Sequence, residues 1–407
     1  MRRYQGPDGL AAVAGPWAGV SPKRREPLKR TVAAADFLIK LRRVSRSRLD
    51  GGRLGFMVTD ITPDLDIEQH DALQAYLRHT GRIGDAETIV ARSLTGGVSN
   101  RVVLVERANG DRWVLKQALP KLRVQVDWFS SPARSHREAL GLRWLEELAP
   151  LGTITPLVFE DVARHLLAMK AVPEPHENWK TRLLEGRVED DHIAQFARLI
   201  AAIHRRGSDH RDQMSAIFAD RSFFESLRVE PYYGYTSAQV PDTAGFYGAL
   251  MADTRATSLT VVHGDFSPKN VLIHDGRLIL LDHEVIHFGD PAFDLGFGLT
   301  HLLSKAHHVP SRRTDFARAA HSLWNSYSEA LDDVPWQDVL EARVVRHALG
   351  CLLARVAGRS PLEYLSAEER ARQRTAVVAV MHKPPATVRG LIDAFVTLLD
   401  ADPGIHM

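Results

Sequence analysis

The sequence predicts an α+β protein of two lobes, a small β-rich N-lobe and a larger, mainly helical C-lobe. Runs rich in β-branched residues concentrate before residue 173, helical periodicity dominates after Pro175, and one hairpin interrupts the helices within 261–284. Two prolines, Pro173 and Pro175, mark the change of character. We therefore expect the N-lobe to span residues 57–173 and the C-lobe to span residues 174–407.

The N-lobe elements follow from periodicity and turn signals. A proline and acids precede an apolar face that repeats at helical spacing in 64–80, and Asn109-Gly110 separates two β-rich runs as in a hairpin. A second helical face precedes the last strand, which ends at the prolines. We expect helices over 64–80 and 135–148, and strands over 88–94, 101–106, 112–116 and 164–172.

The C-lobe elements are mostly amphipathic helices. The exception is a hairpin whose strands, 271–273 and 277–281, are joined by the turn signal His274-Asp275-Gly276. Apolar residues recur at helical spacing in the other segments. We expect helices over 191–206, 315–331, 336–356, 367–381 and 387–399.

Composition restricts the class of protein. The 407 residues are 44% hydrophobic and 25% charged, as in ordinary globular chains. With 52 Lys+Arg against 50 Asp+Glu, the net charge of +2 does not favour a nucleic-acid partner. The single cysteine, Cys351, excludes a disulfide framework and fits a reducing cytoplasm, and no apolar run approaches the ~20 residues of a membrane helix. The oligomeric state stays open.

Residues 1–56 are strongly basic and allow three interpretations. Arg2-Arg3 before a weakly apolar run resembles a targeting peptide, although Pro16 and several glycines interrupt that run. A basic arm for nucleic acid or membrane would also explain the charge. We expect instead a disordered extension ahead of Met57, because the segment lacks periodicity and a convincing cleavage site.

The segment that predicts chemistry is 263–270, which reads His-Gly-Asp-Phe-Ser-Pro-Lys-Asn. Asp265 and Asn270 have the spacing of a kinase catalytic loop, in which the aspartate accepts the acceptor hydroxyl's proton and the asparagine binds Mg²⁺. The hairpin returns the chain, so Asp282 can face Asn270 across one ion, and oxygen ligands suit hard Mg²⁺. Aspartate and asparagine also serve loops structurally. The complete order of strand, His-Gly-Asp, Asn, hairpin and Asp282 favours the catalytic interpretation.

The N-lobe supplies candidate nucleotide-binding residues. Lys116 ends the second strand of the first hairpin, where an ammonium would hold the α- and β-phosphates of ATP, and Glu138 on the next helix would orient it. Glycines in the loop before the hairpin would let backbone N–H groups approach phosphates, and the last strand would contact adenine at its end. The remaining candidates are Gly96, Gly97, Ser99, Asn100, Ala171 and Val172.

Three motifs together resemble the aminoglycoside phosphotransferase and choline kinase superfamily. They are the string 263–270, Asp282-His283-Glu284, and Gly-Asp-Pro-Ala-Phe-Asp-Leu at 289–295. The resemblance covers about residue 57 to the C-terminus. It implies a bilobal protein-kinase-like fold and ATP- and Mg²⁺-dependent transfer to a hydroxyl group.

The resemblance also implies roles for single residues. Asp265 would be the catalytic base, and Asn270 and Asp282 the metal ligands. Asp294 would brace the backbone of the catalytic loop, and Glu284 would assist the metal through water. For Lys269, we expect a solvated side chain rather than a phosphate contact.

A small-molecule acceptor is favoured over a protein. Asp282 is followed almost at once by Pro291 and Asp294, and no Ala-Pro-Glu follows in that region, so no peptide-docking segment is evident. Sugars, amino alcohols, antibiotics and nucleoside-like compounds stay open as acceptors, and so does the choice of ATP or GTP. Two alternatives also stay open: a non-catalytic nucleotide-binding protein of the same fold, and an atypical protein kinase. Candidate pocket residues are Arg228, Tyr232, Tyr233 and 355–364.

Overall fold

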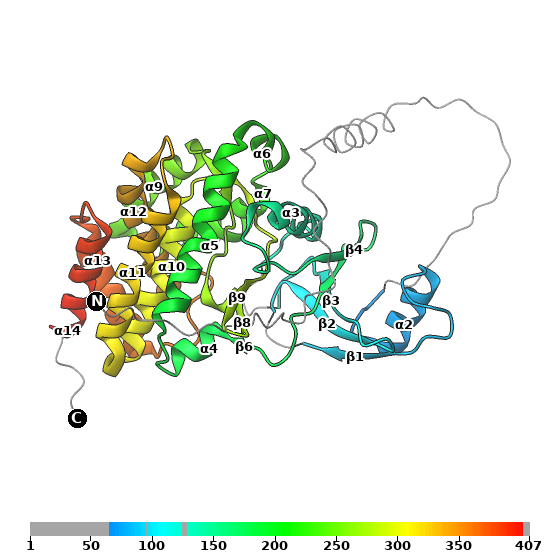
Figure 1. Ribbon diagram of the computed structural model, residues 1–407. Coiled ribbons are helices and arrows are strands. Elements are labelled where there is room, and N and C mark those ends of the chain that lie inside the picture. The colour runs from blue at the N-terminus through cyan, green and yellow to red at the C-terminus, as the bar shows by residue number, and fades with distance from the viewer. Residues whose placement is uncertain (1–64, 95–96, 124–127, 402–407) are drawn as a thin grey trace, which may run out of the picture. The chain divides into compact units, whose positions relative to one another are not determined.

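The computed structural model describes residues 65–94, 97–123 and 128–401, all within one compact unit, Pro63–Met407 (Figure 1). The predictions for residues 1–56, for Met57 and for Gly96 lie outside the described residues. Among the described helices, none combines the length and the apolarity that crossing a bilayer requires.

The N-lobe is built on an antiparallel five-stranded sheet with the order β1-β2-β3-β5-β4. One face, which includes Leu115 and Ala168, packs on Leu73 and Leu77 of helix α2. The alternate side chains, such as Met169, pack on helix α3, as the two-residue period of a strand requires. The strands are β1 (Ile89–Ser93), β2 (Asn100–Arg107), β3 (Arg112–Ala118), β4 (Leu157–Asp161) and β5 (Leu166–Lys170), and the helices are α2 (His70–His79) and α3 (Arg134–Leu148).

The first helix begins later than the sequence predicts. Helix α2 starts at His70, whereas we expected helix from residue 64. The Asp66 carboxylate accepts the backbone N–H of Glu68 at 2.9 Å, and the Asp66 carbonyl accepts that of Gln69 at 3.1 Å. Aspartate side chains stabilise turns in this way, so a turn replaces the first helical turns.

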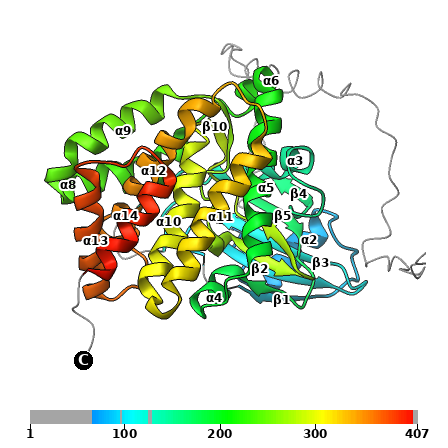
Figure 2. The same ribbon diagram turned by 60° about the vertical axis from the view of Figure 1, so that its left-hand side comes forward.

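The C-lobe is mainly helical. Helices α5, α10 and α11 lie side by side in both views, and α12 packs on α10 (Figures 1 and 2). Its helices are α4 (Trp179–Leu184), α5 (Asp190–Asp209), α6 (Arg211–Ile217), α7 (Ser222–Phe224), a π-helical segment (Glu225–Gly234), α8 (Tyr235–Gln239), α9 (Ala244–Ala256), α10 (Ala292–His308), α11 (Arg313–Leu331), α12 (Gln337–Ala357), α13 (Ala367–Met381) and α14 (Val388–Asp400).

Two small antiparallel sheets position the segment 263–270. One has the order β6-β8-β9, and the other pairs β7 with β10. The segment 263–270 therefore runs from β7 into β8, and the chain returns along β9 to Asp282 before it enters β10. The strands are β6 (Glu177–Asn178), β7 (Thr260–Val262), β8 (Val271–His274), β9 (Arg277–Leu280) and β10 (His287–Gly289).

The predicted fold class is confirmed: a β-rich lobe precedes a helical one, and both predicted hairpins form. The predicted boundary between the lobes at residue 173 stays a prediction. The last strand of the large sheet ends at Lys170, and the Ala171 N–H still donates to the Arg112 carbonyl at 2.9 Å. Val172, the next predicted adenine-contacting residue, is buried.

Candidate active site

The backbone of the segment 263–270 is fixed by Asp294 at the start of α10. The Asp294 carboxylate accepts the backbone N–H of His263 at 2.7 Å and of Gly264 at 2.8 Å, and it is fully buried. The expected bracing role of Asp294 is confirmed. The Nδ1 atom of buried His263 accepts the N–H of Asp265 at 3.2 Å, so the position of the aspartate is set on both sides.

Gly264 is required by both conformation and space. Its φ is +78°, and a Cβ atom built there would lie 2.9 Å from the Val285 carbonyl oxygen. We expect Gly264→Ala to lower the free energy of unfolding by about 2–5 kcal/mol, since backbone strain and overpacking add. Urea unfolding of the two proteins measures this difference.

Gly276 offers a matched control for that substitution. It has a similar φ of +71°, but a Cβ atom there would meet no atom within 4 Å. Gly276→Ala should therefore cost only the backbone term, about 1–2 kcal/mol. Equal losses for the two variants would contradict a steric role of Gly264 against Val285.

Asp265 is a buried carboxylate with cations on both oxygens. Its Oδ1 lies 2.8 Å from Nη2 of Arg228, and its Oδ2 lies 3.0 Å from Nζ of Lys269. The Asn270 side-chain amide also donates to Oδ2, at 2.7 Å. Burial alone would raise the pKa of Asp265, but the charges of Arg228 and Lys269 outweigh it and hold the pKa well below its usual value. The group is therefore ionised at neutral pH.

Lys269 is exposed, as expected for a solvated side chain, with 43% of the side chain accessible. The expectation did not include its ion pair: the ammonium pairs with Asp265 four residues earlier. The 3-10 turn Pro268–Asn270 folds the chain back, so the lysine and the aspartate meet.

Lys116 joins the N-lobe to the segment after β9. Its Nζ lies 2.6 Å from Oε1 of Glu138 on α3 and 2.9 Å from Oδ1 of Asp282. Burial would lower the pKa of Lys116, but the two carboxylates raise it above the usual value. Burial raises the pKa of Glu138 to about 7, partly offset by Lys116. The structure therefore brings together the strand lysine, the helix glutamate and the hairpin aspartate that sequence reasoning selected.

A backbone hydrogen bond brings Asp282 close to Asn270 of the segment 263–270. The N–H of Leu281 donates to the Asn270 carbonyl at 2.8 Å, which places the end of the hairpin next to Asn270. Asp282 has a φ of +68°, an uncommon conformation that aspartate tolerates better than most residues. Backbone strain of this kind concentrates at functional sites.

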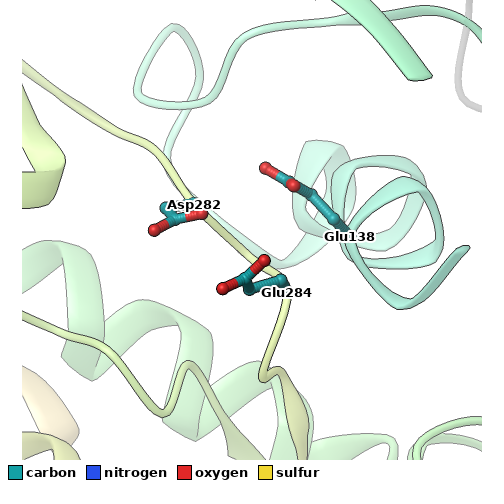
Figure 3. A group of neighbouring side chains, drawn as sticks. All are labelled: Glu138, Asp282 and Glu284. Carbon is teal, nitrogen blue, oxygen red and sulfur yellow. The ribbon is translucent and has the colours of Figure 1, made fainter. Parts of the chain in front are cut away.

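A group of three carboxylates is the candidate cation site. Ligand atoms of Glu138, Asp282 and Glu284 lie within 4.8 Å of one another, and their side chains point into the same space (Figure 3). Carboxylate oxygens are the ligands that Mg²⁺ prefers, so this donor set fits the ion. Asn270 was expected to share the ion with Asp282; its amide nitrogen is engaged by Asp265, which leaves Oδ1 as its ligand atom.

Glu284 has a structural setting that the sequence did not reveal. Its Oε2 accepts from Nε of Arg134 and from Nδ2 of Asn100, both at 3.1 Å. Arg134 is fully buried and also donates to the carbonyls of Ser99 and Leu119. One arginine therefore ties the loop before β2 to the carboxylate group. Nothing in the sequence distinguishes it from other helix arginines.

The predicted phosphate loop is only partly described. A Cβ atom at Gly97 would meet Val102 at an ordinary 3.7 Å, so packing within the described chain does not require glycine there. Ser99 and Asn100 are buried, and the Asn100 amide donates to Ser99 Oγ as well as to Glu284. The Asn100 side chain is thus engaged within the chain.

The predicted acceptor-pocket residues have different settings. Tyr233 is fully buried, and its hydroxyl lies 2.8 Å from Nδ1 of His347, so it is a core residue and does not line a pocket. Two guanidinium groups lie over the Tyr232 ring, that of Arg228 at 5.6 Å and that of Arg355 at 5.7 Å from the ring centroid. Arg228 itself contacts Gly264 and Asp265 of the segment 263–270.

Comparison with known proteins identifies a family of phosphotransferases. The model of the phosphotransferase enzyme family matches residues 90–330, which is more than half of the chain. Methylthioribose kinase from Yersinia enterocolitica is 24% identical over 294 residues, which cover 63% of this chain and 73% of that kinase. Methylthioribose kinase from Pectobacterium carotovorum is 23% identical over 295 residues, covering 64% and 73%. The structure of a choline/ethanolamine kinase family protein from Mesorhizobium loti aligns at 16% identity over 81% of this chain and 98% of that one, with a TM-score of 0.47.

Proposed function

Because the chain belongs to the phosphotransferase enzyme family, we propose that it transfers the γ-phosphate of ATP to a hydroxyl group of a small molecule. The observation that carries the proposal is the meeting of Lys116 with Asp282, 2.9 Å apart. It joins the candidate nucleotide lysine of the N-lobe to the segment that holds Asp265. The kinases with which the chain shares 23–24% identity are named for a sugar acceptor, methylthioribose.

Asp265 would position the acceptor hydroxyl and receive its proton late in the transfer step. Its pKa is held low by Arg228 and Lys269, so it is a weak base. Phosphoryl transfer through a loose transition state needs positioning and charge neutralisation more than a strong base. A firmly held carboxylate suits that task.

The carboxylates Glu138, Asp282 and Glu284 would hold Mg²⁺, and Asn270 would add its Oδ1, the side-chain atom that Asp265 leaves unengaged. The ion would neutralise charge on the phosphate oxygens. Lys116 occupies this acidic group in the described structure, and its ammonium would turn from the carboxylates to the phosphates when nucleotide binds.

The test is Mg²⁺-dependent ATP consumption by the full-length chain with a panel of acceptors: methylthioribose, other sugars, amino alcohols and aminoglycosides. A single acceptor class should stimulate consumption. Lys116→Met should weaken Mg·ATP binding about tenfold to hundredfold, since it removes charge-assisted hydrogen bonds to phosphate.

Lys383→Met is the control, because Lys383 is an exposed lysine that follows α13. It should leave the affinity for Mg·ATP unchanged. Wild-type affinity in Lys116→Met would contradict the role of the lysine. Absence of Mg·ATP binding by the wild type would contradict the proposed function as a whole.

A further inference from the structure

Three cationic side chains from different helices form a group that the proposed transfer step does not use. We call Lys180 of α4, Lys305 of α10 and Arg355 of α12 the basic cluster. The ammonium groups of Lys180 and Lys305 lie 5.9 Å and 5.3 Å from the ring centroid of Tyr364. The charges of Lys180 and Arg355 both act on Lys305.

Lys305 is fully buried without a carboxylate partner. Its Nζ donates to the His301 carbonyl at 3.2 Å, and none of the acidic side chains in the described segments lies within ion-pair distance of it. Burial, Lys180 and Arg355 lower the pKa of Lys305 to about 7. Exposed Glu363, which pairs with Lys180, opposes them. A buried ammonium without a counter-ion is costly, and the lowered pKa reflects that cost. An anion bound beside Lys305 would supply the missing counter-charge and favour the protonated form.

Three residues next to Lys305, namely His301, Arg355 and Tyr364, carry unsatisfied polar atoms. Nε of Arg355, Nε2 of His301 and the hydroxyl of Tyr364 are buried and have no hydrogen-bond partner in the described structure. Buried polar groups nearly always have partners. The arginine Nε can only donate, and the hydroxyl and the imidazole can donate or accept, so a ligand with several acceptor oxygens would satisfy all three.

The basic cluster is connected to the catalytic aspartate by one aromatic ring. Arg355 donates to the Tyr232 hydroxyl at 3.2 Å, and Arg228 lies over the same ring. Arg228 in turn forms the ion pair with Asp265. A chain of contacts through Tyr232 and Arg228 therefore links the cluster to the carboxylate that would receive the hydroxyl proton.

We propose that the basic cluster binds an oxyanion, a carboxylate or a phosphate ester, carried by the acceptor whose hydroxyl is placed at Asp265. This inference rests on the proposed function and names its substrate class. The oxyanion would supply the counter-charge that Lys305 lacks and would compete with Glu363 for Lys180. Polycationic acceptors such as aminoglycosides would be repelled by the same charges.

The experiment measures the Tm of the full-length chain in saturating Mg·ADP, with sodium sulfate or with sodium chloride at equal ionic strength. Sulfate should raise the Tm of the wild type more than chloride does. In Lys305→Met only the general salting-out effect of sulfate should remain, whereas Lys383→Met should behave as the wild type. Methionine fills similar volume without a buried charge, so the variant should fold. Lys180→Met provides a second variant and should reduce the excess.

Two further Tm measurements, one with other anions and one at other pH values, test the proposal in more detail. Replacing sulfate with acetate or inorganic phosphate identifies the anion class. The anion that resembles the group on the acceptor should give the largest difference in Tm rise between the wild type and Lys305→Met. With sulfate, the excess should shrink as the pH rises through about 7, where Lys305 loses its proton. The charged and titratable groups that face Lys305 are Lys180, Arg355, His301, Glu363 and Tyr364.

Two outcomes would overturn the oxyanion subsite alone. Sulfate could raise the Tm of Lys305→Met above its value in chloride as much as it does for the wild type. Alternatively, sulfate could raise the Tm of the wild type no more than chloride does, while Mg·ADP does raise it. A failure of Mg·ADP itself to raise the Tm would overturn the proposed function and this inference with it. The two failures are therefore distinguishable.

Discussion

Replacing Asp265 with asparagine is expected to lower kcat about hundredfold to ten-thousandfold, the usual contribution of a positioned proton acceptor. The substitution keeps the shape of the side chain but removes the negative charge that would hold the hydroxyl and receive its proton. Mg·ADP affinity should change little, because the candidate nucleotide contacts, Lys116 and Glu138, lie around Asp282. Steady-state kinetics and calorimetric Mg·ADP titration check the two expectations.

Removing the charge of Asp265 should also affect stability, and this effect must be separated from the effect on kcat. Asparagine leaves Arg228 and Lys269 without their common anion, so the variant should also be less stable. Kinetics should therefore be measured well below its Tm.

Asp275→Asn is the matched control. Asp275 is exposed in the turn of the β8–β9 hairpin at a φ of +47°, which asparagine tolerates. It should retain wild-type kcat. Wild-type turnover in Asp265→Asn would show that the acceptor proton goes elsewhere.

Most of the fold was predictable because its elements carry local signals. Helices with one apolar face, such as α5 and α14, were found from their period, and both hairpins were found from Asn-Gly or Asp-Gly turns. Helix α10 was missed. It is buried on nearly every side, so its apolar residues show no helical period.

Glycines also made helix α10 difficult to predict from the sequence. Gly296 suggests a break, but its role is spatial: a Cβ atom there would lie 2.6 Å from Cβ of His347 on α12. The π-helical segment 225–234 was also missed, because Pro231 and Gly234 favour a loop. That omission matters, since the segment carries Arg228 and Tyr232.

Some residues of the candidate site could also be predicted from the sequence, and others could not. Asp265, Asn270, Asp282 and Asp294 lie in contiguous strings whose spacing carries a chemical meaning, so they could be selected from the sequence. Arg134, Lys180 and Lys305 have no such string around them. Their importance comes from burial and from partners far along the chain, for instance Glu284, 150 residues after Arg134. Only the tertiary structure brings such residues together.

The second large effect is expected from Arg228→Met. The guanidinium donates to the Gly264 carbonyl at 2.9 Å as well as pairing with Asp265, and both charges are buried. Breaking a buried ion pair by removing one partner typically costs about 3–5 kcal/mol. Urea unfolding at neutral pH should show a loss of that size.

The pH dependence of that loss has a definite sign. Arg228 lowers the folded-state pKa of Asp265, so the pair stabilises the protein above the unfolded value, about 3.9 for aspartate. The stabilisation is lost as the pH falls through the folded value. The stability difference between wild type and Arg228→Met should therefore shrink below about pH 4. The acidic limb of the rate profile should move to higher pH in the variant, because Asp265 then takes up its proton more readily.

Arg318→Met is the control for removing an arginine charge. Arg318 forms an exposed ion pair with Asp315 at 3.2 Å, and such pairs contribute about 1 kcal/mol or less. If Arg228→Met cost no more than this and left the acidic limb unmoved, Asp265 would not depend on Arg228 for its charge. If the limb moves and turnover at neutral pH persists, the arginine serves to keep the carboxylate ionised and in place, and Lys269 with Asn270 suffices for the transfer step itself.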